Sequence, residues 1–141
     1  MDFVGNWRCI PLCVRRKLDL IGVKLKLSHW LEFTQEQRQT LVDWSDQSPE
    51  LVDLREHLRK LTQFMAEGMV KDLPIAEGEP WQILSVVPKV VQQAALNRSI
   101  SISAGQWADL FEIERFALCK LARPGHDHHN LDAAFSEVME S

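Results

Sequence analysis

Two stretches of this 141-residue sequence repeat each other at a constant distance of 77 residues, without a gap. The shared positions include a proline, a tryptophan and an arginine, which together are unlikely to match by chance. The corresponding positions are Ile10-Pro11 and Val87-Pro88, Val14 and Val91, Val23 and Ile100, Leu25 and Ile102, Trp30 and Trp107, Phe33 and Leu110, Arg38 and Arg115, and Leu41 and Leu118. Two copies are too few for a solenoid, which needs about three units, but they can pack face to face as a dimer does. The sequence therefore predicts two pseudo-symmetric units, residues 8–44 and 85–121.

Each unit is predicted to contain a helix, a short strand and two tightly joined helices. Apolar positions from Leu12 onward predict a helix that ends at Gly22. Val23–Leu27 and Ile100–Ser103 alternate as half-buried strands do, and we expect them to pair as a two-stranded ribbon. Capping boxes are predicted at Thr34 and Ser103, and Ser28 is expected to cap the helix that carries Trp30. The fold class is therefore mainly α, in one domain spanning residues 1–141.

Between the two units, the most regular amphipathic pattern spans residues 49–67. Ser48-Pro49-Glu50 is a typical helix start, and leucines follow at spacings of three and four. Residues 70–81 are predicted to be irregular. A helix from Leu84 to Ala95 is expected to be interrupted at Pro88, residues 123–130 to form a loop, and a short helix to end the chain.

Composition favours a cytoplasmic globular protein. Hydrophobic residues make up 45% of the chain and charged residues 26%, which is enough for a core. No run approaches the ~18 apolar residues of a membrane span. The first residues do not resemble a signal peptide, and three cysteines at irregular spacing fit a reducing compartment.

Charge is distributed unevenly along the chain. Residues 1–27 carry six basic and two acidic side chains, whereas the whole chain has a net charge of −4. A basic N-terminal segment on an acidic protein suits docking to an acidic partner protein and suits duplex DNA poorly. The basic residues predicted to contact the partner are Arg8, Arg15, Arg16, Lys17 and Lys24.

Soft metal ligands provide an alternative function, a metal- or redox-responsive module. Cys9 and Cys13 lie four residues apart, and His126 and His128 lie near the C-terminus. Two thiolates and two imidazoles could form a tetrahedral zinc site if these regions met. Because buried cysteines also serve as small apolar residues, the simpler interpretation is packing.

Catalysis and DNA binding have less support. The sequence contains no nucleophile elbow and no phosphate-binding glycine loop, so we expect a protein without a catalytic residue and without a bound cofactor. Gln35 to Trp44 could serve as the second helix of a helix-turn-helix motif. It carries a single arginine and no lysine, too few cations to hold phosphates. A DNA-binding regulator is therefore the least favoured class.

Two long motifs resemble the nitrate reductase-associated protein family, whose cyanobacterial members include a nitrate reductase maturation protein. The N-terminal motif consists of Arg8-Cys9-Ile10-Pro11, Val14-Arg15, Lys17-Leu18-Asp19, Gly22-Val23-Lys24-Leu25 and Trp30. The C-terminal motif consists of Arg115-Phe116-Ala117-Leu118, Lys120-Leu121, Arg123-Pro124-Gly125-His126 and Asn130. The chain departs from the family pattern at Ser45, where members often have cysteine, and at residues 127–129.

The resemblance implies a non-catalytic assembly or maturation factor that binds assimilatory nitrate reductase, a molybdenum and iron–sulfur enzyme. On this hypothesis the basic residues dock an acidic patch of the enzyme. The loop formed by Arg123, Pro124, Gly125 and His126 would then make the more specific contact. The resemblance implies neither a membrane nor a nucleic acid as partner.

Overall fold

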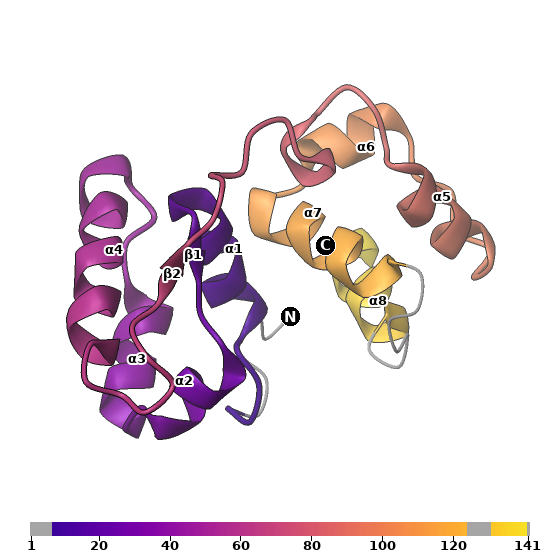
Figure 1. The fold of residues 1–141 in the computed structure, drawn as a ribbon. Coiled ribbons are helices and arrows are strands. Elements are labelled where there is room, and N and C mark those ends of the chain that lie inside the picture. The colour runs from indigo at the N-terminus through magenta and orange to yellow at the C-terminus, as the bar shows by residue number, and fades with distance from the viewer. Residues whose placement is uncertain (1–6, 124–130, 141) are drawn as a thin grey trace. The chain divides into compact units, whose positions relative to one another are not determined.

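The computed structural model describes residues 7–123 and 131–140, and these residues are mainly α-helical, as the sequence predicts. The helices are α1 (Leu12–Ile21), α2 (Leu27–Glu32), α3 (Gln35–Asp43), α4 (Ser48–Thr62), the 3₁₀ helix η1 (Pro80–Gln82), α5 (Lys89–Leu96), α6 (Ala104–Asp109), α7 (Glu112–Ala122) and α8 (Leu131–Glu140) (Figure 1). Two short strands, β1 (Val23–Lys24) and β2 (Lys71–Asp72), form a small antiparallel sheet. None of the described helices is long and apolar enough to cross a bilayer.

The chain divides into two compact units, an N-terminal unit (Asp2–Ala76) and a C-terminal unit (Glu77–Ser141). Helix starts recur 77 residues apart, at Leu12 and Lys89, at Leu27 and Ala104, and at Gln35 and Glu112. A proline precedes both α1 and α5. The three helix starts therefore follow the same 77-residue spacing as the matched residues. A two-fold relation between the units, and their packing as one domain, stay predictions.

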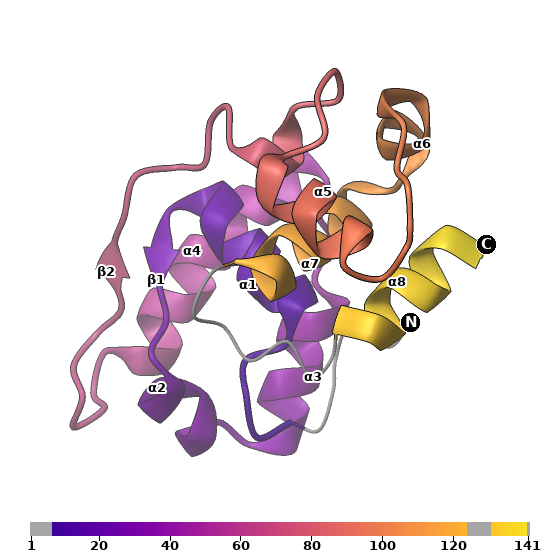
Figure 2. The ribbon, with the colours of Figure 1, turned by 90° about the vertical axis from the view of Figure 1, so that its right-hand side faces the viewer.

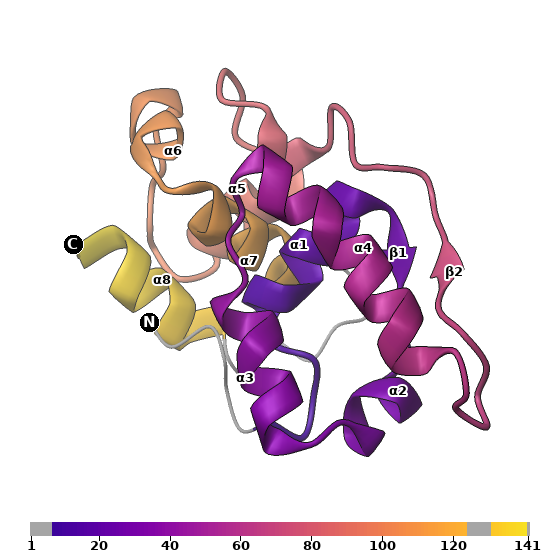
Figure 3. The same cartoon turned by 90° about the vertical axis from the view of Figure 1, so that its left-hand side faces the viewer.

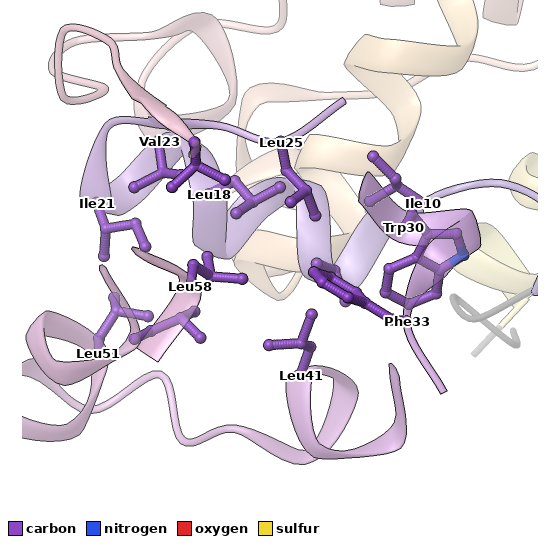
Figure 4. Close-up of a cluster of buried hydrophobic side chains, with 13 residues drawn as sticks. Ile10, Leu18, Ile21, Val23, Leu25, Trp30, Phe33, Leu41, Leu51 and Leu58 are labelled. Atoms are coloured by element: carbon purple, nitrogen blue, oxygen red, sulfur yellow. The ribbon is translucent and has the colours of Figure 1, made fainter. Parts of the chain in front are cut away.

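The core of the N-terminal unit collects apolar side chains from α1, β1, α2, α3 and α4 (Figure 4). Helix α4 packs against α1 (Figure 3). Its residues Leu51, Leu54 and Leu58 are buried, as the amphipathic pattern predicts. Complete burial of one such leucine contributes about 1.5–3 kcal/mol. Trp30 is fully buried, and the Trp7 ring lies parallel to it with ring centroids 6.1 Å apart.

Helix α4 ends at Thr62, five residues before the predicted boundary at 67. The buried Thr62 hydroxyl donates to the Leu58 carbonyl at 2.8 Å and accepts the Val70 N–H at 3.0 Å. Because this side chain bonds a residue eight positions onward, it stabilises a turn in which Gly68 adopts a φ of 93°. The chain then reverses toward β2.

The predicted pairing of Val23–Leu27 with Ile100–Ser103 is wrong. β1 pairs with β2 instead, with Val23 opposite Asp72 and Lys24 opposite Lys71. Beyond the strand, the Leu73 N–H donates to the Gly22 carbonyl at 2.8 Å, so this pairing is made inside one unit. The Ile100 N–H is engaged locally, because it donates to the Ala95 carbonyl at 2.8 Å at the end of α5.

Helix α7 is the central element of the C-terminal unit and contacts η1, α5 and α8 (Figure 2). The buried ring of Trp81 meets the Phe116 ring edge to face, with centroids 5.0 Å apart. Arg115 is buried, and its Nε donates to the Trp81 carbonyl at 2.9 Å. Arg98, which follows α5, pairs with Asp132 of α8.

The two predicted capping boxes are confirmed, whereas other helix starts differ from the predictions. Thr34 and Ser103 each accept the N–H of the glutamine three residues later, at 3.1 Å. Helix α2 begins at Leu27, before Ser28, because the His29 ring accepts the N–H of its N-cap residue, Lys26. The helix predicted from Leu84 begins only after Pro88, since proline disfavours helical geometry in the residue before it.

Candidate partner-binding site

Two of the five predicted basic contact residues point into the protein. Arg16 and Lys17 lie in α1 and are 8% and 5% exposed, respectively. Helix α1 begins after Pro11 and ends at Gly22, and its buried side carries Val14, Leu18 and Ile21. Because Arg16 and Lys17 lie partly on that side, both cations find acceptors within the N-terminal unit.

Lys17 binds the end of a neighbouring helix. Its Nζ donates to the carbonyls of Leu41 at 3.2 Å and Val42 at 2.7 Å, both in the last turn of α3. The last carbonyls of a helix lack partners within the helix and carry a partial negative charge. Burial lowers the pKa of Lys17, and Arg16 adds to this effect. Lys17 therefore stabilises the fold, and because its side chain is buried, little of its surface is accessible to a partner.

Arg16 pairs with Asp46, which follows α3. Its Nη2 lies 2.5 Å from an Asp46 carboxylate oxygen. This hydrogen bond lowers the pKa of Asp46. The ion pair joins α1 to the segment between α3 and α4, so reversing the charge of Arg16 would disturb the fold as well as any docking surface.

The other three basic residues are exposed. The Arg15 Nε donates to the Ile10 carbonyl at 3.0 Å, which fixes the guanidinium near the start of α1. Arg8 is exposed just before this helix, and Lys24 is exposed on β1. These side chains can form charge-assisted hydrogen bonds with carboxylates of a partner.

Lys71 is an exposed cation that sequence reasoning did not identify. It lies directly opposite Lys24 in the antiparallel pair, and neither lysine has an ion-pair partner among residues 7–123 and 131–140. Directly opposed like charges weaken a strand pair, so a carboxylate bound between them would relieve the repulsion. Lys71 lies in a segment predicted to be irregular, and nothing in the sequence signals its pairing with β1.

The proposed metal ligands are only partly described. Cys9 is exposed and Cys13 is half-buried, and burial raises the pKa of the Cys13 thiol despite the opposing effect of Lys17. A raised thiol pKa disfavours the thiolate that binds zinc. Within the described part of the chain, no three histidine, cysteine or acidic residues are placed to hold a metal. His126 and His128 lie outside that part.

The predicted C-terminal contact loop lies almost entirely outside the described residues. Arg123 is exposed immediately after α7. Pro124, Gly125 and His126 belong to the segment 124–130, which the structure does not describe. Their role in binding stays a prediction.

The family model described as conserved nitrate reductase-associated protein matches residues 1–138. No curated protein and no solved structure matches the chain. The match includes both sequence motifs and both compact units.

Proposed function

We propose a function from one premise: the chain belongs to the conserved nitrate reductase-associated protein family. The protein acts as a non-catalytic assembly or maturation factor that binds assimilatory nitrate reductase and supports its activity. The observation that carries this proposal is the family match, which extends over residues 1–138. The family description names the associated enzyme, and the proposal adds that association is direct and serves maturation.

The contact surface in this proposal is smaller than the sequence alone predicts. It consists of the exposed cations Arg8, Arg15 and Lys24, to which we add Lys71 because it lies opposite Lys24. Arg123 and the loop that follows it supply a second contact. Arg16 and Lys17 are not part of this contact surface. They stabilise the fold beneath it, because Arg16 pairs with Asp46 and Lys17 binds the end of α3. Electrostatic contacts of this kind increase the association rate more than the affinity.

The first experiment tests complex formation. Size-exclusion chromatography with light scattering is applied to the full chain mixed with its cognate nitrate reductase, with and without the enzyme's cofactors. Preference for the cofactor-free enzyme is the expected result for a maturation factor. Binding only to the loaded enzyme would contradict maturation and indicate a stable accessory subunit. A lack of complex in both states would contradict the proposed function.

The second experiment tests the surface with a charge reversal that spares the buried cations. The double variant Arg15→Glu/Lys24→Glu is compared with Lys60→Glu, which changes another exposed lysine of the same unit. We expect the double variant to reduce the association rate about tenfold at low salt, with a smaller difference at high salt. Association rates equal to those of Lys60→Glu would exclude these residues from the interface.

A further inference from the structure

The C-terminal unit contains an apolar groove between η1 and the start of α5. Its volume is about 360 Å³, and its lining residues are Pro80, Ile83, Val86, Pro88, Lys89 and Val90. The side chains along it remain accessible, with 40% of Ile83, 62% of Val86 and 37% of Val90 exposed. A groove of this size can accept an apolar side chain.

Packing of the C-terminal unit does not explain these exposed residues. Val87 and Val91 on the same segment are buried, at 4% and 0% exposure, and the core takes its apolar contacts from them. Val86 and Val90 each directly precede one of these buried valines, and together with Ile83 they remain exposed. Contiguous exposed apolar residues of this kind are typical of protein interaction sites.

A hydrogen bond from a buried tryptophan fixes the backbone at one edge of the groove, and the N-terminal unit contains a similar bond. There, the Trp30 Nε1 donates to the Trp7 carbonyl at 2.8 Å, and the Trp7 ring stacks on the Trp30 ring. In the C-terminal unit the equivalent Trp107 Nε1 donates to the Ile83 carbonyl at 2.9 Å. Ile83 borders the groove, and no described aromatic ring stacks on Trp107. Trp107 is itself fully buried, so this hydrogen bond holds the Ile83 backbone at the edge of the groove.

The charge of Lys89 indicates which kind of segment the groove can bind. Lys89 is the one ionisable residue among the groove-lining residues, and it is exposed. It has no ion-pair partner in the described ranges. A free lysine beside an apolar groove is complementary to an apolar side chain with a carboxylate nearby.

We propose that the groove seats an apolar side chain of a nitrate reductase segment that also presents an aspartate or glutamate to Lys89. This inference rests on the proposed function, because it takes nitrate reductase as the binding partner. It assigns the C-terminal unit an anchoring contact that is separate from the exposed cations of the N-terminal unit. The apolar side chain supplies affinity, and the lysine selects the acidic neighbour.

The test measures the Kd of full-length variants for the cognate nitrate reductase. Val86→Asp places a charge in the groove, and Val52→Asp is the matched control because Val52 is 68% exposed on α4. We expect Val86→Asp to raise Kd at least about tenfold, as loss of a central anchor does. Val52→Asp should stay within about twofold of wild type. Lys89→Glu should raise Kd by about three- to tenfold relative to Lys60→Glu.

The outcomes separate this inference from the proposed function. Failure of the wild-type protein to bind contradicts the proposed function itself. If wild-type protein binds and Val86→Asp leaves the Kd unchanged, the groove is not part of the interface. If Lys89→Glu leaves the Kd unchanged, the bound segment does not present a carboxylate to Lys89. If Val86→Asp lowers the melting temperature of the protein alone, Val86→Ala replaces it, and a wild-type Kd for that variant overturns the groove. A dimer by light scattering that Val86→Asp dissociates would assign the groove to a second copy of the chain.

Discussion

The two units have the same order of helices, but the last carbonyls of corresponding helices find different hydrogen-bond donors. In the N-terminal unit α3 ends at Asp43, and Lys17 reaches across from α1 to its last carbonyls. At the position equivalent to Lys17, 77 residues onward, α5 carries Ala94, which is 6% exposed. Helix α7 continues to Ala122, so the carbonyl of Leu118, equivalent to Leu41, still has an N–H four residues ahead within its own helix. A longer helix removes the need for the buried lysine.

This difference shows why charge alone did not identify the docking residues. Arg16 and Lys17 of α1 bind the end of the shorter α3 and its following segment, and the equivalent positions of α5 are Gln93 and Ala94. The excess of positive charge in residues 1–27 is therefore partly structural. The exposed apolar residues that line the groove of the C-terminal unit, in contrast, do not take part in its core.

The largest expected effect contrasts Gly22 with Ser99, which follow α1 and α5 at equivalent positions. Both adopt a positive φ, of 66° and 58° respectively. A Cβ on Gly22 would lie 2.3 Å from the Leu73 carbonyl oxygen, so Gly22→Ala must displace the segment that pairs with β1. We expect Gly22→Ala to lower the free energy of unfolding by about 2–4 kcal/mol, from backbone strain and the disturbed pairing.

The matched variant is Ser99→Gly, which removes the unfavourable backbone geometry of a non-glycine residue but increases the entropy of the unfolded chain. The two effects oppose each other, so this variant should stay within about 1 kcal/mol of wild type. Urea denaturation followed by tryptophan fluorescence measures both changes. If both substitutions changed the free energy of unfolding equally, the clash with the Leu73 carbonyl would not explain the loss of stability in Gly22→Ala.

Patterns confined to neighbouring residues predicted the local structure well. The capping boxes at Thr34 and Ser103, the end of α1 at Gly22 and the buried face of α4 each depend on residues within one helix. These features are set by local hydrogen bonding and helical spacing, which a sequence displays directly. The mainly helical fold followed from them.

Contacts between distant segments could not be read from the sequence in the same way. The partner of β1 is a two-residue strand in a segment rich in proline and glycine, where no alternation signals a strand. Burial of Arg16 and Lys17 depends on where α3 ends relative to α1. The groove beside α5 results from a helix start delayed to Lys89, which left Ile83 and Val86 outside the helix.

A smaller effect is expected from Lys17→Met, which tests the contrast between the two helix ends. The substitution leaves the Leu41 and Val42 carbonyls without their lysine donor, although methionine keeps most of the apolar stem. We expect a loss of about 2 kcal/mol in the free energy of unfolding. Lys24→Met, at an exposed position, should change it by less than about 0.5 kcal/mol. Similar losses for both variants would show that Lys17 contributes only as a surface charge.

The smallest effect concerns the pH dependence of the N-terminal unit, which contains both histidines of the described ranges, His29 and His57. The His57 ring packs against Trp44 with centroids 4.8 Å apart, and burial, helped by Lys60, lowers its pKa below 6.5. The unfolded chain therefore binds a proton more readily than the folded protein. The His57 contribution is fully present above pH 6.5 and is lost as the pH falls from 6.5 toward the lower folded pKa.

The variant His57→Phe keeps a ring against Trp44 and removes this titration. The free energy of unfolding, measured by urea denaturation between pH 8 and pH 5, should therefore fall less steeply below pH 6.5 for the variant than for wild type. Subtracting the two curves cancels the contributions of the titrating groups that both proteins share. Parallel curves over the whole range would show that His57 titrates alike in the folded and unfolded chain. In that case burial of the Nε2, which has no hydrogen-bond partner among the described residues, would not disfavour the protonated ring.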